Sequence, residues 1–222
     1  MQAMGTLAGG IAHDFNNILG AILGFGEMAL RGTRAGSRAR RDIEFIMTAG
    51  ERGRALVERI LAFSRSGISE RVPVHIESIT REALQLLSAS VPAEVRMTLR
   101  LAAGNAAILG DATQWHQVVM NLATNALQAM PDGGELEVTL DLQQLSNPHM
   151  AATGPIEPGP YVVLQVADTG AGIAPEHLAR IFDPFFTTRE AGCGTGLGLS
   201  LVHSIVTDLG GAVDVVSTPG NG

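Results

Sequence analysis

The first thirty residues carry an apolar pattern that restricts them to an amphipathic helix. Apolar side chains recur at alternating steps of four and three residues, at Met4, Ala8, Ile11, Phe15, Ile18, Ile22, Phe25 and Ala29. This spacing is the a/d seam of a heptad repeat and predicts a helix that packs along one face. His13 falls on the opposite face, beside Asp14 and one turn before Asn17. An exposed histidine taken alone is most often an ordinary surface residue.

A second helical pattern follows a polar turn that contains two glycines. Residues 31–37 form this turn, and Ser37 is a suitable N-cap for the helix that follows. The apolar and small residues near one face of that helix are Ile43, Ile46, Met47, Gly50, Val57, Ile60, Leu61 and Ser64. Because two helices with one apolar stripe each bury little surface, we expect a hairpin that dimerises into a four-helix bundle. A monomeric hairpin packed on the rest of the chain is the alternative.

The charged residues and the single cysteine exclude several classes of protein. All fifteen basic residues are arginines, and the absence of lysine excludes Walker A and Schiff-base chemistry. Residues 1–71 hold ten arginines against seven acidic residues, whereas residues 72–222 hold five against fifteen, which indicates two domains and argues against a nucleic-acid partner. Cys193 fits a reducing compartment. No apolar run approaches the ~18 residues of a membrane span, so we expect a cytoplasmic chain whose membrane attachment, if any, lies outside these residues.

Turn signals divide the chain into two expected domains. Residues 1–67 form the dimerisation domain, residues 68–75 form a linker, and residues 76–222 form the second domain. In the second domain, helical patterns cover 76–87, 113–130 and 200–209, strand patterns cover 95–101, 135–142, 161–167 and 212–217, and a long loop lies near 146–160. The fold class is therefore α+β: a helical hairpin followed by an α/β sandwich, a mixed sheet with helices on one face.

Two glycine-containing segments indicate a ligand that carries phosphate groups. Residues 168–172 read Asp-Thr-Gly-Ala-Gly after a strand pattern, and residues 192–198 read Gly-Cys-Gly-Thr-Gly-Leu-Gly before a helix. Glycine lets backbone amides approach an anion closely, and a helix N-terminus adds a favourable dipole. The spacing does not fit a Rossmann domain. Asp168 can accept a hydrogen bond from an exocyclic amine such as that of adenine, although a turn-capping carboxylate is an equally good interpretation.

Two asparagines in one helical pattern indicate a place for a metal ion. Asn121 and Asn125 are four residues apart and share a face. Carboxamide oxygens suit Mg²⁺, which needs few protein ligands when phosphates supply the rest. Asparagine is a poor helix former, so two in register favour a binding function, with core hydrogen bonding as the alternative.

Five segments, in this order along the chain, resemble the sequence boxes of sensor histidine kinases of two-component systems. Residues 7–17 contain the His-Asp-Phe-Asn-Asn core of the phosphoacceptor box, and residues 121–126 resemble the N box. Residues 168–173 and 194–199 are similar to the two glycine boxes, and residues 181–188 to the F box. The resemblance implies a dimeric phosphoacceptor domain followed by an ATP-binding domain of the Bergerat type.

The resemblance further implies an ATP-dependent protein histidine kinase. His13 would take the γ-phosphoryl group of ATP and pass it to an aspartate in the receiver domain of a response regulator. Asp14 would act as general base, Asn17 would position water for dephosphorylating the regulator, and Asn125 would hold Mg²⁺. The nucleotide-binding residues carried over are Asn121, Asn125, Asp168, Gly170, Gly172, Ile173, Phe182, Arg189, Gly192, Gly194, Thr195, Gly196, Leu197, Gly198 and Leu199.

Two positions depart from the family pattern and leave an alternative function open. Arg189 stands where the family usually carries lysine, and Gln128 stands where many members carry aspartate or glutamate. The alternative is a catalytically weak scaffold or phosphatase that binds nucleotide and docks a regulator. An ATPase whose nucleotide drives dimer clamping is disfavoured, because it gives His13 no function.

Overall fold

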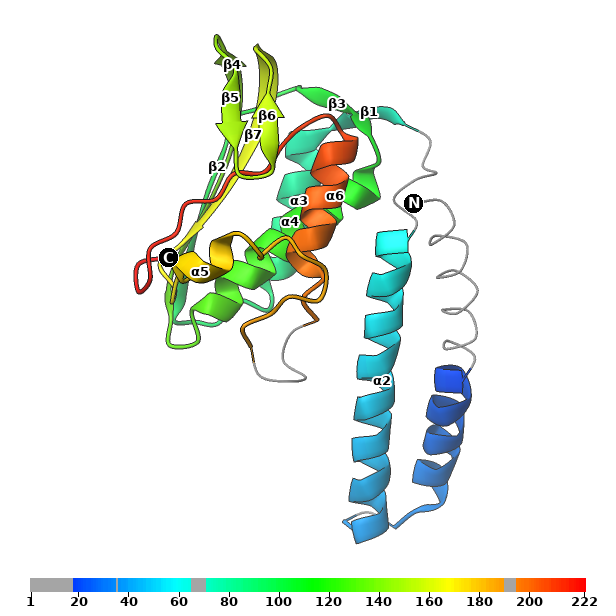
Figure 1. Ribbon diagram of the computed structural model, residues 1–222. Coiled ribbons are helices and arrows are strands. Elements are labelled where there is room, and N and C mark those ends of the chain that lie inside the picture. Colours follow the sequence, from blue (N-terminus) through cyan, green and yellow to red (C-terminus); the bar gives the residue numbers. More distant parts are fainter. Residues whose placement is uncertain (1–17, 35, 65–70, 190–194) are drawn as a thin grey trace. The chain divides into compact units, whose positions relative to one another are not determined.

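A computed structural model describes residues 18–34, 36–64, 71–189 and 195–222, with the side chains of 51–52 and 54–64 excepted (Figure 1). The chain forms two compact units, Met1–Ile68 and Ser69–Gly222. Within the described ranges, no helix combines the length and the apolar character needed to cross a bilayer.

The first unit contains two antiparallel helices joined by a short turn. Residues 18–32 are helical, and α2 spans Arg38–Ser64. The Ser37 hydroxyl accepts a hydrogen bond from the Arg40 backbone N–H at 3.2 Å, which confirms Ser37 as the N-cap of α2. The Arg40 guanidinium donates to the Leu30 carbonyl oxygen at 3.2 Å and so satisfies an acceptor at the end of the first helix. Side-chain hydrogen bonds therefore close both helix ends at this turn.

Glycines bring the two helices of the hairpin close together. A Cβ atom added to Gly50 of α2 would lie 3.0 Å from Leu23 Cδ2, and one added to Gly53 would lie 3.1 Å from Leu19 Cδ2. In the opposite direction, a Cβ atom on Gly26 would lie 2.8 Å from Met47 Cγ. The contact inside the hairpin thus runs along leucine side chains that fit into spaces above glycines.

The described part of the predicted heptad seam, residues 18–29, lies largely outside this contact. Ile18 and Phe25 of the seam are 57% and 71% exposed, because the first helix packs on α2 through a neighbouring stripe that contains Leu19 and Leu23. The expectation of one apolar stripe per helix was therefore incomplete, since the first helix carries two. We use the name uncovered apolar residues for the large exposed ones of the described hairpin: Ile18, Ile22, Phe25, Met28, Phe45 and Ile46.

The second unit is built on a mixed sheet covered by helices on one face. Strand β2 (Val95–Leu101) pairs in parallel with β4 (Gly134–Leu145), which pairs antiparallel with β7 (Gly159–Asp168). The helices α3 (Ile76–Ser88), α4 (Ala112–Ala129) and α6 (Gly198–Asp208) form one layer beside this sheet, with the short α5 (Pro175–Leu178) near its end (Figure 1). The predicted mixed sheet with helices on one face is confirmed.

Alternation along β4 separates the core from the outer face of the sheet. Leu136, Val138 and Leu140 are fully buried against α3 and α4, as expected for a strand with one face covered. Glu135 and Glu137 point to the other side, where they form ion pairs with arginines of β2 at 3.3 Å and 3.0 Å. The outer face of the sheet is therefore charged, and the hydrophobic core lies between sheet and helices.

The structure corrects two expected segments. The expected loop near 146–160 contains a hairpin of β5 (His149–Ala151) and β6 (Gly154–Ile156). The expected strand over 212–217 is wrong, because these residues join no ladder. Instead, the Thr153 N–H donates to the Val213 carbonyl oxygen at 3.2 Å. Asp214 accepts from the Ala152 N–H and lies 3.2 Å from His149 Nε2, which holds the pKa of Asp214 below its usual value. Val213 and Asp214 of this segment therefore bond to the turn of the β5–β6 hairpin.

Part of the segment expected as a linker is a strand. Residues Val72–His75 form β1, which pairs antiparallel with β3 (Ala107–Gly110). The Arg71 guanidinium also donates to the Asp208 carbonyl oxygen at 2.8 Å, at the end of α6. These bonds tie residues 71–75 to the second unit.

Candidate functional site

Helix α4 carries the two predicted asparagines on one face. The Asp111 carboxylate caps this helix by accepting from the Thr113 backbone N–H at 2.7 Å. Asn121 and Asn125 are both half-buried. Asn121 Nδ2 donates to the Gln117 carbonyl oxygen at 2.9 Å, which fixes this side chain against its own helix. Within the described ranges the Asn121 Oδ1 atom has no hydrogen-bond donor, so it is available to a ligand.

The N-terminus of α6 lies against both asparagines. A Cβ atom added to Gly198 would lie 3.1 Å from Asn121 Oδ1 and 3.5 Å from Asn125 Nδ2. Glycine at this position therefore leaves open the space that a side chain would fill in front of the carboxamides. The structure shows no side-chain cap for α6 among the residues it describes. The first N–H groups of this helix can therefore bind an anion, and the helix dipole favours it.

Asp168 lies at the end of β7, close to the last turn of α4. Its Oδ1 atom accepts from the Gly170 backbone N–H at 2.8 Å, so the turn-capping interpretation is correct for one of its oxygens. Within the described part of the chain, the second oxygen has no hydrogen-bond partner. A Cβ atom on Gly170 would lie 2.6 Å from the Ala129 carbonyl oxygen, and the Ala171 N–H donates to that oxygen at 3.0 Å. The turn is thus held against α4, and the second oxygen of Asp168 is available to a ligand.

Residues near the end of the chain complete this turn. The Ile173 N–H donates to the Ser217 hydroxyl at 2.8 Å, and the Gly220 N–H donates to the Ala171 carbonyl oxygen at 2.8 Å. Gly172 has a positive φ of 67°, which glycine adopts without strain. The backbone of the first glycine segment is therefore fixed from both sides.

The segment before the second glycine box is attached to α6. The Phe182 ring lies 5.6 Å from the His203 ring of α6, tilted by 55°. The Phe185 N–H donates to the Gly196 carbonyl oxygen at 2.9 Å, and both residues have positive φ values, 69° and 63°. A positive φ is strained for phenylalanine, so this contact holds Phe185 in a conformation it would otherwise avoid.

Arg189 reaches α4 from this segment. Its Nη1 atom donates to Gln128 Oε1, and its backbone N–H donates to the Thr187 hydroxyl at 3.2 Å. The guanidinium therefore lies beside the same helix as Asn121 and Asn125. Sequence analysis assigned no role to Gln128, although its position three residues after Asn125 places it on the same face and could have indicated one.

The structure brings some of the predicted site residues together, and others lie outside the residues it describes. His13, Asp14, Asn17, Gly192 and Gly194 lie outside the described residues. The other predicted site residues that lie on or beside α4 are Asn121, Asn125, Asp168, Gly170, Arg189 and Gly198. Leu197 is buried, so only its backbone can face a ligand, and Thr195 accepts from the Leu197 N–H at 3.4 Å. Ile173, Phe182 and Leu199 are half-buried.

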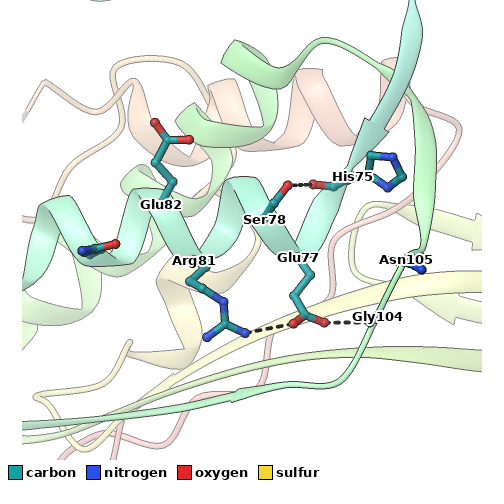
Figure 2. A pocket seen from close by; sticks show the side chains of 8 residues that line it. His75, Glu77, Ser78, Arg81, Glu82, Gly104 and Asn105 are labelled. Atoms are coloured by element: carbon teal, nitrogen blue, oxygen red, sulfur yellow. Dashed lines mark hydrogen bonds and ion pairs between the residues drawn. The ribbon is translucent and has the colours of Figure 1, made fainter.

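A separate hollow lies on α3 and contains none of the predicted site residues (Figure 2). Its volume is about 520 Å³, and it is lined by residues of α3, His75 and the turn at Gly104 and Asn105. The Glu77 carboxylate accepts from the Gly104 N–H at 2.7 Å and from Arg81 at 2.9 Å. Glu77 is therefore satisfied by its neighbours within this hollow.

Two family descriptions match the chain, one for each unit. Residues 110–222 match the family described as histidine kinase-, DNA gyrase B-, and HSP90-like ATPase, and residues 3–67 match the His Kinase A (phospho-acceptor) domain. Sensor kinase CckA of Brucella abortus (strain 2308) is 37% identical over 222 residues, which cover 100% of this chain and 24% of that protein. Sensor histidine kinase ZraS of Escherichia coli (strain K12) is 32% identical over 224 residues, 100% of this chain and 44% of ZraS. The chain therefore spans less than half the length of these curated relatives.

Solved structures show the same arrangement of elements. Full-length ShkA in complex with AMPPNP covers 97% of this chain with a TM-score of 0.75 and 27% identity, and the match spans 43% of ShkA. Histidine kinase ThkA in complex with the response regulator TrrA covers 94% of this chain with a TM-score of 0.57 and 23% identity, over 56% of that chain. The second of these likenesses shows the fold alone.

Proposed function

Because this chain belongs to the sensor histidine kinases of two-component systems and carries their catalytic core, we propose that it phosphorylates itself on His13 with ATP. The phosphoryl group then passes to an aspartate of a response regulator. The observation that supports this proposal most directly is the placement of Asn121 and Asn125 against the N-terminus of α6, for which the described residues provide no side-chain cap. A phosphate-bearing donor fits there, and the phosphoacceptor match at residues 3–67 supplies its acceptor.

Different described residues bind different parts of ATP, the phosphoryl donor. The free oxygen of Asp168 accepts a hydrogen bond from the exocyclic amine of adenine, while the other oxygen keeps the turn. The α6 N-terminus and Arg189 stabilise the phosphate charge. Asn125, with Asn121 adjacent, provides hard oxygen ligands for Mg²⁺, which offsets phosphate charge during transfer. AMPPNP in the ShkA complex supports ATP as the nucleotide.

The transfer itself needs a nucleophile and a proton acceptor. A lone pair on one imidazole nitrogen of His13 attacks the γ-phosphorus, the bond from that phosphorus to the β,γ-bridging oxygen breaks, and ADP leaves with the electron pair. Asp14 accepts the proton that the other ring nitrogen loses. Asn17 positions the water that hydrolyses the phosphorylated regulator.

The functional unit is a homodimer in the cytoplasm. The uncovered apolar residues of the hairpin include two phenylalanines that are more than 70% exposed, and a second hairpin can bury them in a four-helix bundle. Both ATP and the receiver domain of a response regulator are available to a cytoplasmic protein.

Labelling with γ-labelled ATP and Mg²⁺ tests the proposed activity. We expect label that survives alkali, is lost in acid and disappears in the His13→Gln variant. The matched control is His75→Gln, an exposed histidine outside the nucleotide site, which keeps the label. Nucleotide binding without any label would contradict kinase activity and support the alternative, a weak scaffold or phosphatase.

A further inference from the structure

Five carboxamide side chains, not two, share one face of α4 and form a stripe: Gln114, Gln117, Asn121, Asn125 and Gln128. At 100° per residue, Asn125 lies 40° around the helix from Asn121, and Gln128 lies 20° to the other side. Gln128 follows Asn125 by about 4.5 Å along the axis, less than one turn. From the α6 N-terminus, the stripe therefore extends toward the end of α4, and Gln128 is its last member.

Gln128 binds the Arg189 guanidinium beside this stripe and leaves its positive charge in place. Its Oε1 atom accepts from Arg189 Nη1. In the described part of the chain, Arg189 forms no ion pair, so its charge is not matched by a carboxylate. Gln128 is exposed and Arg189 is half-buried. A neutral amide thus orients a guanidinium whose other N–H groups and full charge are left for an anion.

Backbone hydrogen bonds at and before Arg189 restrain the position of this residue. The Arg189 backbone N–H is bonded to Thr187 at 3.2 Å, and the Phe185 N–H is bonded to Gly196 at 2.9 Å. Gly196 lies two residues before Gly198, which contacts the asparagines. Arg189 is therefore anchored to the same structure that carries the proposed phosphate site.

We propose that Gln128 is a positioning residue that directs Arg189 to the terminal phosphate of the nucleotide. This inference rests on the proposed function, because it places ATP on the α4 stripe. A carboxylate at position 128 would pair with the guanidinium and compete with the phosphate, whereas an amide only orients it. Gln128 acts through Arg189, and its effect is confined to ligands that carry a third phosphate.

Comparing a triphosphate analogue with ADP isolates this effect. With Mg²⁺ present, AMPPNP and ADP are titrated into the wild-type chain, Gln128→Ala, Gln128→Glu and Arg189→Ala, and affinities are measured by calorimetry. We expect the preference for AMPPNP over ADP to fall about fivefold in Gln128→Ala, the size expected for an ordinary hydrogen bond. In Gln128→Glu and Arg189→Ala we expect about tenfold, the lower end for a hydrogen bond with a charged group. Affinity for ADP stays within twofold of wild type.

A double variant tests whether Gln128 acts through Arg189. In Gln128→Ala combined with Arg189→Ala, we expect the preference for AMPPNP to equal that of Arg189→Ala alone. The matched control is Gln144→Glu, an exposed glutamine near the far end of β4, which leaves both affinities unchanged. Circular dichroism of each variant establishes that it folds, and autophosphorylation rates give KM and kcat separately, with the larger change expected in KM for ATP.

Each outcome separates this inference from the proposed function. If wild type prefers AMPPNP and labels on His13, but folded Gln128 variants keep the wild-type preference, the positioning role is wrong and the kinase assignment stands. Additive losses in the double variant also overturn it, because Gln128 would then act independently of Arg189. If wild type neither binds AMPPNP nor labels, the proposed function itself fails.

Discussion

At the scale of single residues, Asp168 illustrates how one carboxylate serves both fold and ligand. One oxygen accepts from the Gly170 N–H, and the other has no partner within the described residues. Sequence analysis treated turn capping and ligand binding as alternatives. The geometry makes them compatible, because an ionised carboxylate has acceptor sites on two oxygens.

Replacing Asp168 by asparagine separates these two tasks. In Asp168→Asn the amide oxygen can still accept from Gly170, while an NH₂ group replaces the oxygen that faces the adenine amine. We expect the affinity for AMPPNP to fall about tenfold or more, because a hydrogen bond to a charged acceptor is lost and two donors meet. The midpoint of urea unfolding changes little. The control is Asp141→Asn, since Asp141 likewise caps a neighbouring N–H at 2.7 Å but lies on the sheet. Unchanged affinity in Asp168→Asn would contradict the adenine contact.

At the scale of elements, the hairpin shows that one helix can carry two apolar stripes. Leu19 and Leu23 meet the glycines of α2, whereas Ile18 and Phe25 stay exposed in the single chain. Exposed apolar surface of this kind is typical of an interface between subunits. The inner stripe therefore closes the hairpin, and the outer stripe is available to a second copy.

Charged substitutions among the uncovered apolar residues test this division. We expect Phe25→Glu and Phe45→Glu to convert the dimer to a monomer, because each phenylalanine contributes about 1.5–3 kcal/mol when fully buried and occurs twice in a symmetric dimer. The helix content measured by circular dichroism is preserved. Sedimentation velocity gives the oligomeric state. Leu86→Glu serves as the control, since Leu86 is 62% exposed on α3 of the other unit. A Phe25→Glu chain that remains dimeric would show that the seam is not the interface.

At the scale of the whole molecule, the two units have different sources of stability. The second unit has its own core between a three-stranded sheet and the helices α3 and α4, and α6 packs on α4. The described hairpin leaves large apolar side chains uncovered and depends on association to bury them. Nucleotide should therefore stabilise the second unit against unfolding, whereas a higher protein concentration should stabilise the first.

Calorimetric unfolding of the intact chain tests this difference. We expect two transitions. AMPPNP with Mg²⁺ at about a hundredfold excess over its Kd should stabilise the second unit by about 2.7 kcal/mol. The other transition should move with protein concentration and not with nucleotide. As a control, AMP at the same concentration lacks the phosphates that bind the α6 N-terminus and should shift neither transition strongly. A single transition that nucleotide and protein concentration shift together would contradict independent units.

Much of the site could be predicted from the sequence because its parts are local. Asn121 and Asn125 share a face by helical spacing, and glycine before α6 follows from the need for a close backbone approach. The contact between Gln128 and Arg189 could not be predicted this way, since 61 residues separate the two. The free oxygen of Asp168 likewise depends on the turn that uses its partner.

Local periodicity by itself predicted the long helices and the three strands of the mixed sheet, and short local motifs carried the resemblance to the sequence boxes. These features are encoded within windows of about 11–18 residues, where spacing fixes which side chains share a face. Tertiary structure alone decided which stripe of the first helix closes the hairpin. It also decided that residues 212–217 join no sheet, and that Val213 and Asp214 bond to the turn of the β5–β6 hairpin. It also decided that Arg189 meets the carboxamide stripe. An apolar or polar pattern indicates that one face of a helix or strand packs against something. Which segment packs there depends on long-range packing and hydrogen bonding.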